Sequence, residues 1–339
     1  MIKFKTEEWC FVDELDYWKS IYSDRVNDSH WFITNKFEMD SEYLACKNNT
    51  NGRRRKKAFP NIDKDLCEML NKCNDICERL KSIFSQGKID GGNNTRAREA
   101  LSKSLGKMHQ LIVKSDVCLD GGINKNMIYT NETNELITIV IDNCKYLIPM
   151  FSEFVVGDVS DILKISRRFD TIIVDPPWYN KSIKRRKDYQ ICKRNSLNPL
   201  HYLPIPDLLN ENGIVFMWIT NNARLQEEVA SIIQDKFKLK VVGRWKWLKV
   251  TKNFEPTISN SKAHHKLPYE EVWILSNMLM SIPFDYVITS VPHISSSRKP
   301  PIGLIFKQLF PSYLFGRYLL PSTLTIGLEA LYFQNESFF

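Results

Sequence analysis

Short apolar segments with strand character alternate with helical segments over residues 145–339. The strand candidates are residues 154–156, 171–174, 214–218, 241–247, 271–275, 286–288 and 325–332, and the helix candidates are residues 206–209, 223–235 and 302–310. Alternation of this kind predicts an α/β fold with an open, largely parallel sheet and helices on both of its faces. The chain has 13 glycines in 339 residues, which argues against a repetitive β architecture rich in tight turns.

The residues before this region have a different pattern. Residues 1–60 mix aromatic and charged side chains without a clear period, and we expect an irregular basic and aromatic arm there. Its basic run at residues 53–57 suits a nuclear localisation signal, a contact with phosphates or a solvated surface segment. These three interpretations stay open.

Apolar side chains then follow a helical period over residues 63–84 and again over residues 95–113. A strand pair is expected near residues 136–149, where the helical pattern has ended. We therefore expect a smaller, mainly helical N-terminal domain over residues 61–144, followed by a larger domain over residues 145–339.

Composition and charge indicate which kinds of segment, site and partner this chain is expected to have. No window holds eighteen uninterrupted apolar residues, so a membrane-spanning helix is not expected, and the polar first residues lack the apolar core of a signal peptide. The eight cysteines include no C-x-x-C pair, so we expect reduced thiols and no metal site. The net charge of +8 suits a polyanionic partner such as a nucleic acid.

The motif Asp175-Pro176-Pro177-Trp178 directly follows an apolar strand candidate. Ligands of open α/β sheets bind outside the carboxyl ends of the strands, where this motif is expected to lie. Asp175 offers a carboxylate and Pro176 a carbonyl that can accept hydrogen bonds from an amine, and Pro177 has no N–H to compete for that carbonyl. A base can stack on the ring of Trp178. These groups suit methylation of the exocyclic amine of adenine, where positive charge develops on a poor nucleophile.

The same motif has a plainer interpretation. A proline turn that ends a strand would bury Trp178 in the core and use Asp175 as a cap of the turn or of a helix. This reading assigns no chemistry to the motif.

Asp175-Pro176-Pro177-Trp178, followed by Asn180, Lys181 and Ser182, resembles the family of eukaryotic N6-adenine methyltransferases. Within that family it is similar to the methyltransferase-like protein 4 subgroup. The similarity extends from residue 145 to residue 339. It implies a Rossmann-like methyltransferase domain that binds S-adenosylmethionine. It also implies a permuted motif order in which the catalytic strand precedes the cofactor-binding element at residues 314–317. That order accounts for the absence of a G-x-G-x-x-G segment.

The resemblance implies roles for individual residues, and it implies no metal. The catalytic residues would be Asp175, Pro176, Pro177 and Trp178. The cofactor would be bound by Asp158, Val159, Asp175, Lys299, Arg317, Gly327, Leu328 and Glu329. The nucleic acid would be bound by Asn180, Lys181 and Ser182. Directly after them come the basic residues Lys184, Arg185 and Arg186, which are expected either to contact phosphates beside the target base or to form a solvated loop.

The chain also departs from the family pattern. Tyr313 stands where the family usually has a glutamate that holds a ribose hydroxyl, and Tyr179 and Ile326 replace two further family residues. Glu270 and Glu271 together carry one glutamate more than the family pattern, so the sequence leaves open which of them takes the family role.

Two functions remain after these departures. The subgroup implies methylation of adenosine in RNA, notably 2′-O-methylated adenosine of a small nuclear RNA, with DNA adenine as a second substrate class. It also implies a protein that acts as a monomer without an obligate protein partner, mainly in the nucleus and also in the cytoplasm. The alternative is a catalytically silent RNA-binding scaffold of the same fold. Asp175 and Trp178 favour catalysis, and Tyr313 favours the scaffold.

Overall fold

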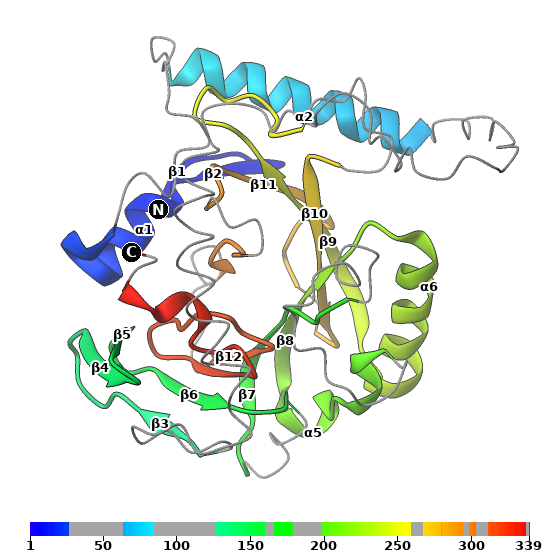
Figure 1. Ribbon diagram of the computed structural model, residues 1–339. Coiled ribbons are helices and arrows are strands. Elements are labelled where there is room, and N and C mark those ends of the chain that lie inside the picture. The colour runs from blue at the N-terminus through cyan, green and yellow to red at the C-terminus, as the bar shows by residue number, and fades with distance from the viewer. Residues whose placement is uncertain are drawn as a thin grey trace, which may run out of the picture.

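The computed structural model describes residues 1–26, 64–84, 127–159, 166–178, 198–258, 267–278, 280–293, 298–302, 311–336 and 339. Within them the main sheet contains β1 (Ile2–Lys5), β2 (Trp9–Val12), β3 (Tyr129–Thr130), β6 (Glu153–Val156), β7 (Phe169–Val174), β8 (Leu209–Ile219), β9 (Lys240–Lys249), β10 (Tyr269–Ser276), β11 (Asp285–Ser290), β12 (Pro311–Leu314) and β13 (Leu324–Gly327). The strand order is β1-β2-β11-β9-β10-β8-β7-β12-β13-β6-β3 (Figure 1). The predicted α/β fold class is confirmed.

The sheet is mixed rather than largely parallel. Strands β6, β13, β12, β7 and β8 are neighbours and run parallel to one another. Strand β10 runs antiparallel to both β8 and β9, whereas β11 is parallel to β9 and to β2. The short edge strands β1 and β3 are antiparallel to their neighbours.

The connections reverse direction in the middle of the parallel half. After β7 the chain goes to β8 on one side, and after β12 it goes to β13 on the other side. Strands β7 and β12 are neighbours, with Val174 opposite Leu314 at their carboxyl ends. This pair of strand ends is a topological switch point, the place where open α/β sheets bind ligands.

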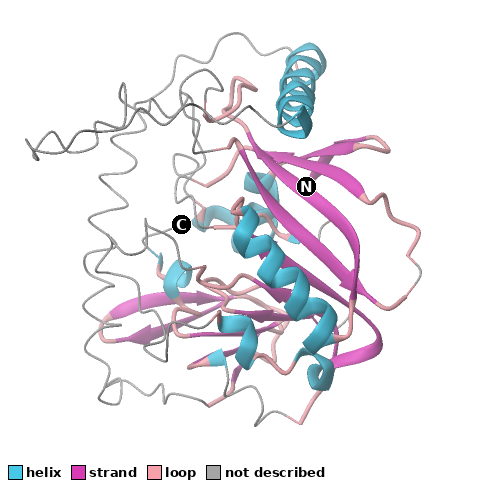
Figure 2. Ribbon diagram, turned by 90° about the vertical axis from the view of Figure 1, so that its right-hand side faces the viewer, coloured by secondary structure: helices cyan, strands magenta, loops and turns pink. Residues whose placement is uncertain are grey.

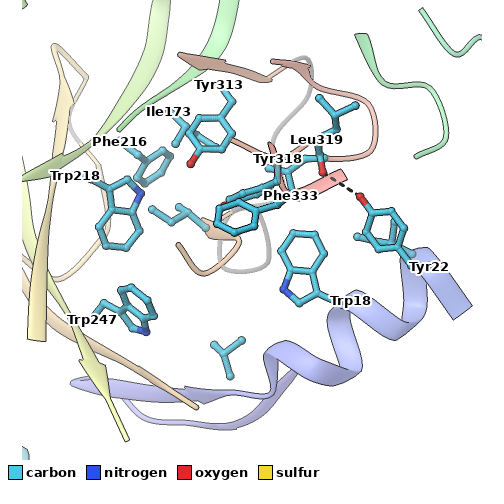
Figure 3. Packing of buried hydrophobic residues seen from close by; sticks show 14 of the residues in the cluster. Trp18, Tyr22, Ile173, Phe216, Trp218, Trp247, Tyr313, Tyr318, Leu319 and Phe333 are labelled. Atoms are coloured by element: carbon cyan, nitrogen blue, oxygen red, sulfur yellow. Dashed lines mark hydrogen bonds between the residues drawn. The ribbon is translucent and has the colours of Figure 1, made fainter. Parts of the chain in front are cut away.

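Side chains of the sheet alternate between two apolar clusters, as the period of two in a strand requires. On β8, Val215 and Met217 pack on the face that α5 (Ile205–Leu208) and α6 (Ala223–Ile232) cover, which faces the viewer in Figure 2. Phe216 and Trp218 point to the opposite face, where they pack with α1 (Glu14–Tyr22) and residues near the C-terminus (Figure 3).

The expectation of an irregular arm is wrong for residues 1–26. β1 and β2 extend the sheet beyond β11. α1 begins at Glu14, after the N-cap residue Asp13, whose side chain accepts a hydrogen bond from the Asp16 amide. The sequence pattern hides these strands because each has only four residues among charged neighbours. The remainder of the expected arm lies outside the described residues.

The first predicted helix of residues 61–144 is confirmed as α2 (Lys64–Ile83). Its buried side chains pack with β2 residues such as Trp9 and with Leu248 of β9, near the edge of the sheet (Figure 1). The second predicted helix, at residues 95–113, lies outside the described residues, so the three-domain division stays a prediction. The strand pair is confirmed as β4 (Ile137–Ile141) and β5 (Cys144–Ile148), joined by Asp142 and Asn143 at φ values of 48° and 60°.

The strand predictions after residue 150 are mostly confirmed, with two exceptions. β12 was not predicted, and the last strand ends at Gly327, five residues before the predicted end. The chain then turns, and the short 3₁₀ helix η7 (Tyr332–Gln334) follows. In the described part, no helix is long and apolar enough to cross a membrane.

Candidate active site

Asp175 lies directly after β7, at the switch point. The strand before it is apolar and its last residues, Ile173 and Val174, are buried. The amide of Asp175 donates to the carbonyl oxygen of Leu314 at 3.2 Å, which ties the start of the motif to the neighbouring strand β12. The carboxylate is therefore held at the carboxyl ends of two parallel strands.

Four charged side chains from different elements meet at this place. The Lys299 ammonium lies 3.7 Å from the Asp175 carboxylate and also forms an ion pair with Glu270 of β10. Lys249, the last residue of β9, pairs with the other oxygen of Glu270. Both ammonium groups also lie over indole rings, Lys299 over Trp218 at 5.2 Å and Lys249 over Trp247 at 4.4 Å.

The two carboxyl groups of this cluster have different protonation behaviour. Burial raises the pKa of Asp175 to about 6, although Lys299 opposes that rise. Burial would also raise the pKa of Glu270, but its ion pairs with Lys249 and Lys299 outweigh burial and bring its pKa to about 2. Glu270 is thus a permanent anion between two lysines, and Asp175 is a carboxylate that can exchange a proton near neutral pH.

The sequence left open which of the two adjacent glutamates belongs to the site, and the geometry distinguishes them. Glu270 belongs to the charged cluster, whereas Glu271 accepts a hydrogen bond from the Trp273 indole at 3.1 Å. Lys249 was not predicted from the sequence. Its position two residues after Trp247, at the end of a strand, was the available signal.

The carbonyl of Pro176 is not left without a donor, contrary to our expectation. It accepts a hydrogen bond from the backbone N–H of Trp178 at 2.8 Å, which closes a tight turn. A carbonyl oxygen has two lone pairs, so it can still accept one hydrogen from an amine.

The indole of Trp178 is 8% exposed and packs in the cluster under α6. Its N–H donates to the carbonyl oxygen of Trp218 at 2.9 Å, which joins the motif to the end of β8. This matches the plainer interpretation of the residue, a buried side chain that fixes the turn. Stacking of the indole on a base stays a prediction.

Residues predicted to bind the cofactor gather at the ends of β12, β13 and β6. Arg317 forms an ion pair with Glu329 at 2.6 Å, and both side chains are only 11% exposed. A Cβ atom on Gly327 would lie 2.7 Å from the Gly316 carbonyl oxygen, so the two strand ends approach more closely than other residues allow. The amide of Gly157 donates to the carbonyl of Gly327 at 3.3 Å, which brings the following Asp158 and Val159 to this edge.

Tyr313, the departure from the family glutamate, is 1% exposed in the core. Its ring lies 5.2 Å from that of Tyr318 in the apolar cluster that Figure 3 shows. Burial raises the pKa of its hydroxyl well above the ordinary value. Tyr313 therefore fills core volume on β12 as a neutral side chain.

The remaining predicted residues are only partly described. Leu328 is half-buried after Gly327. Asn180, Lys181, Ser182, Lys184, Arg185 and Arg186 lie outside the described residues. Among the described residues, no group of three or more His, Cys, Asp or Glu side chains is arranged to hold a metal ion.

The residues that surround this site can support a methyl transfer that uses S-adenosylmethionine. Lys299 suits a carboxylate, Glu329 and Asp158 suit hydroxyl and amine donors, and Gly316 and Gly327 bring backbone atoms close together at the strand ends. The donor and acceptor types thus fit this cofactor.

Comparison with known proteins supports the same assignment. The MT-A70 family profile matches residues 169–329. A DNA N6-methyl methyltransferase of Caenorhabditis elegans is 30% identical over 98% of both chains. The human N(6)-adenine-specific methyltransferase METTL4 is 32% identical over 61% of this chain and 48% of its own length. An N6-methyladenosine RNA methyltransferase, MTA1 of Pyricularia oryzae, is 32% identical over 57% and 56%. The chain therefore spans about half of the human and fungal proteins and nearly all of the nematode one.

Proposed function

The chain belongs to the MT-A70 family, and on that premise we propose that it transfers a methyl group from S-adenosylmethionine to the N6 amine of adenine in a nucleic acid. The observation that carries this proposal is the buried carboxylate of Asp175 at the switch point, 3.7 Å from the Lys299 ammonium. A carboxylate there can accept a hydrogen bond from the amine and stabilise the positive charge that develops on it.

Asp175 and the turn that follows it hold the amine. The carboxylate accepts one N–H, and the second lone pair of the Pro176 carbonyl accepts the other. The hydrogen bond from Trp178 to Trp218 keeps this turn in place. After methyl transfer the nitrogen carries an extra proton, which such an ammonium group loses readily, and Asp175 with a pKa of about 6 is a suitable first acceptor.

The bound cofactor supplies an activated methyl group on a sulfonium. Lys299 would hold its carboxylate as a point charge. Glu329, which pairs with Arg317, would accept hydrogen bonds from its ribose hydroxyls, and Asp158 would accept one from its adenine amine. In this proposal the motif order is permuted, because the catalytic residues follow β7 and the cofactor residues Arg317 and Glu329 come later in the chain.

We propose RNA as the preferred substrate, with 2′-O-methylated adenosine of a small nuclear RNA as the specific target. The support is the resemblance of the D-P-P-W-x-N-K-S segment to the methyltransferase-like protein 4 subgroup. The relatives include proteins named for DNA and for RNA, so DNA adenine is the second substrate class. We also propose that the protein acts as a monomer, mainly in the nucleus and also in the cytoplasm.

The test measures transfer of labelled methyl from S-adenosylmethionine to three oligonucleotides of the same sequence. The first is RNA with one 2′-O-methylated adenosine, the second is unmodified RNA and the third is single-stranded DNA. We expect transfer to the first to be fastest, and we expect Asp175→Ala to abolish transfer to all three.

Each outcome decides between the candidate functions. Faster transfer to DNA would keep the reaction and overturn the RNA preference. Absence of transfer to every oligonucleotide, with nucleic-acid binding retained, would replace the proposal with the silent scaffold.

A further inference from the structure

Arg298, the residue before Lys299, is buried inside a group of aromatic rings. It is 1% exposed, and its guanidinium carbon lies 4.1 Å from the ring centre of Trp18. The ring centres of Tyr318, Phe333 and Phe339 lie 5.6, 5.7 and 5.5 Å away. We call these four rings the Arg298 cage. Since a buried cation is costly without compensation, the aromatic faces stabilise Arg298 in this place.

The cage is joined directly to the backbone of Lys299. The hydroxyl of Tyr318 donates to the carbonyl oxygen of Lys299 at 3.0 Å. The ring of the same Tyr318 packs edge-on against Trp18, with centroids 5.4 Å apart. The backbone is therefore held by the cage on both sides of Lys299, through the Arg298 side chain before it and through its own carbonyl after it. The side chain of Lys299 extends to Glu270 and Asp175.

Helix α1 makes a second contact with the same part of the active-site edge. The carboxyl group of Glu14 accepts a hydrogen bond from the hydroxyl of Ser290, the last residue of β11. The Ser290 oxygen accepts in turn from the Trp247 indole at 2.7 Å. Glu14 and Trp18 lie one helical turn apart, so α1 contacts both Ser290 and Arg298.

We propose that α1 is a positioning element of the methyl-transfer site, in which Trp18 holds Arg298 and, with Tyr318, the backbone of Lys299. The backbone held in this way keeps the Lys299 ammonium between Glu270 and Asp175. The inference rests on the proposed function, because it assigns Lys299 to the carboxylate of the cofactor. Trp18 touches none of the reacting atoms and acts through Arg298.

A loosened Lys299 weakens binding of the cofactor more than it slows the chemical step, because Asp175 remains in place on β7. Trp18→Leu keeps an apolar side chain and removes the aromatic face. We expect it to raise the KM for S-adenosylmethionine about 10-fold and to change kcat less than about 3-fold, in line with the loss of one desolvated cation–π contact. Trp18→Phe retains an aromatic face and is expected to return the KM to within about 2-fold of the parent value.

Trp9→Leu is the matched control for the loss of a buried indole. Trp9 is equally buried and lies on β2 in the same N-terminal segment, but it packs with Phe4 and the α2 cluster. We expect a comparable fall in thermal stability with no change in the KM. If both leucine variants raise the KM equally, Trp18 has only a structural role and the inference is overturned.

Tyr318→Phe keeps the inference testable if Trp18→Leu does not fold. It removes only the hydroxyl that bonds the Lys299 carbonyl, and we expect a rise in the KM of about 5-fold, the effect of one net hydrogen bond. An unchanged KM would overturn the inference. Failure of the proposed function would look different, because the unaltered chain would then transfer no methyl group at all.

Discussion

At the scale of single residues, the switch point holds two lysines and two carboxyl groups, and the two carboxyl groups differ in their protonation behaviour. Glu270 stays ionised because its ion pairs with Lys249 and Lys299 outweigh the effect of burial on its pKa. Burial lowers the pKa of Lys249. Asp175 has a pKa raised to about 6, first by burial and also by the charge of Glu270. Asp175 is therefore the carboxyl group of this cluster that links activity to pH near neutrality.

We expect kcat/KM for methyl transfer to fall below about pH 6, because the protonated form of Asp175 no longer accepts a hydrogen bond from the amine. Lys299→Met removes the nearest cation that lowers this pKa, so the inflection of the profile should move to higher pH. Initial rates of labelled methyl transfer between pH 5 and pH 9 measure both effects.

Lys246→Met serves as the control for that experiment. Lys246 lies on β9 and pairs with Asp285 at 3.5 Å, away from Asp175. Its profile should keep the inflection of the parent chain. An inflection near pH 6 that does not move in Lys299→Met would mean that another group titrates.

At the scale of elements, the carboxyl ends of β12 and β13 approach so closely that Gly327 has no room for a side chain. The obstacle to a Cβ atom is the carbonyl oxygen of Gly316, which is backbone and cannot rotate away. On Gly316 the obstacle is a side-chain atom, the methyl group of Thr325, which lies 2.4 Å from an added Cβ. The two strand ends thus present backbone to the region where Arg317 and Glu329 pair.

Gly327→Ala is expected to separate these strand ends. We expect it to lower the free energy of unfolding by about 1–3 kcal/mol, the usual cost of overpacking, and to weaken S-adenosylmethionine binding more than tenfold in calorimetry. Gly243→Ala on β9 is the control, since its added Cβ would meet the flexible Ile274 side chain at 3.2 Å. Equal binding by both variants would contradict this account.

The sequence predicted most of the elements that carry the site and missed those that support it. β7 and β8 were found because their apolar runs are long and end in clear turns, and the place of Asp175 followed from that. β12 escaped prediction because its four residues begin with a proline and adjoin an apolar run with helical character. Lys249 and Glu14 escaped because single charged residues gain meaning only when β9, β10 and α1 come together in space.

At the scale of the whole molecule, the N-terminal segment closes one edge of the sheet and one side of its core. β2 pairs with β11, and Tyr22 of α1 bonds to Gln334 and packs on Phe339 at 4.3 Å. Residues 1–26 are therefore part of the methyltransferase fold and not a separate arm.

Deletion of residues 1–26 should expose the edge of β11 and one wall of the Arg298 cage, and we expect the product to aggregate. Deletion of residues 1–5 alone removes only the edge strand β1, and this variant should stay folded. Size-exclusion chromatography measures the aggregation of the two deletion variants, and circular dichroism measures their folding and melting temperature. A monodisperse product of the longer deletion, with the melting temperature of the full chain, would show that the segment is dispensable.

The pairing of β2 with β11 also fixes an order of events during synthesis. Trp9 lies beside Val287, about 280 positions later in the chain. At roughly 5–20 residues per second, the first strands leave the ribosome about 15–55 s before their partner exists. Trp9, Phe11 and Trp18 are made well before their native neighbours, so this segment cannot complete its packing until β11 has been synthesised.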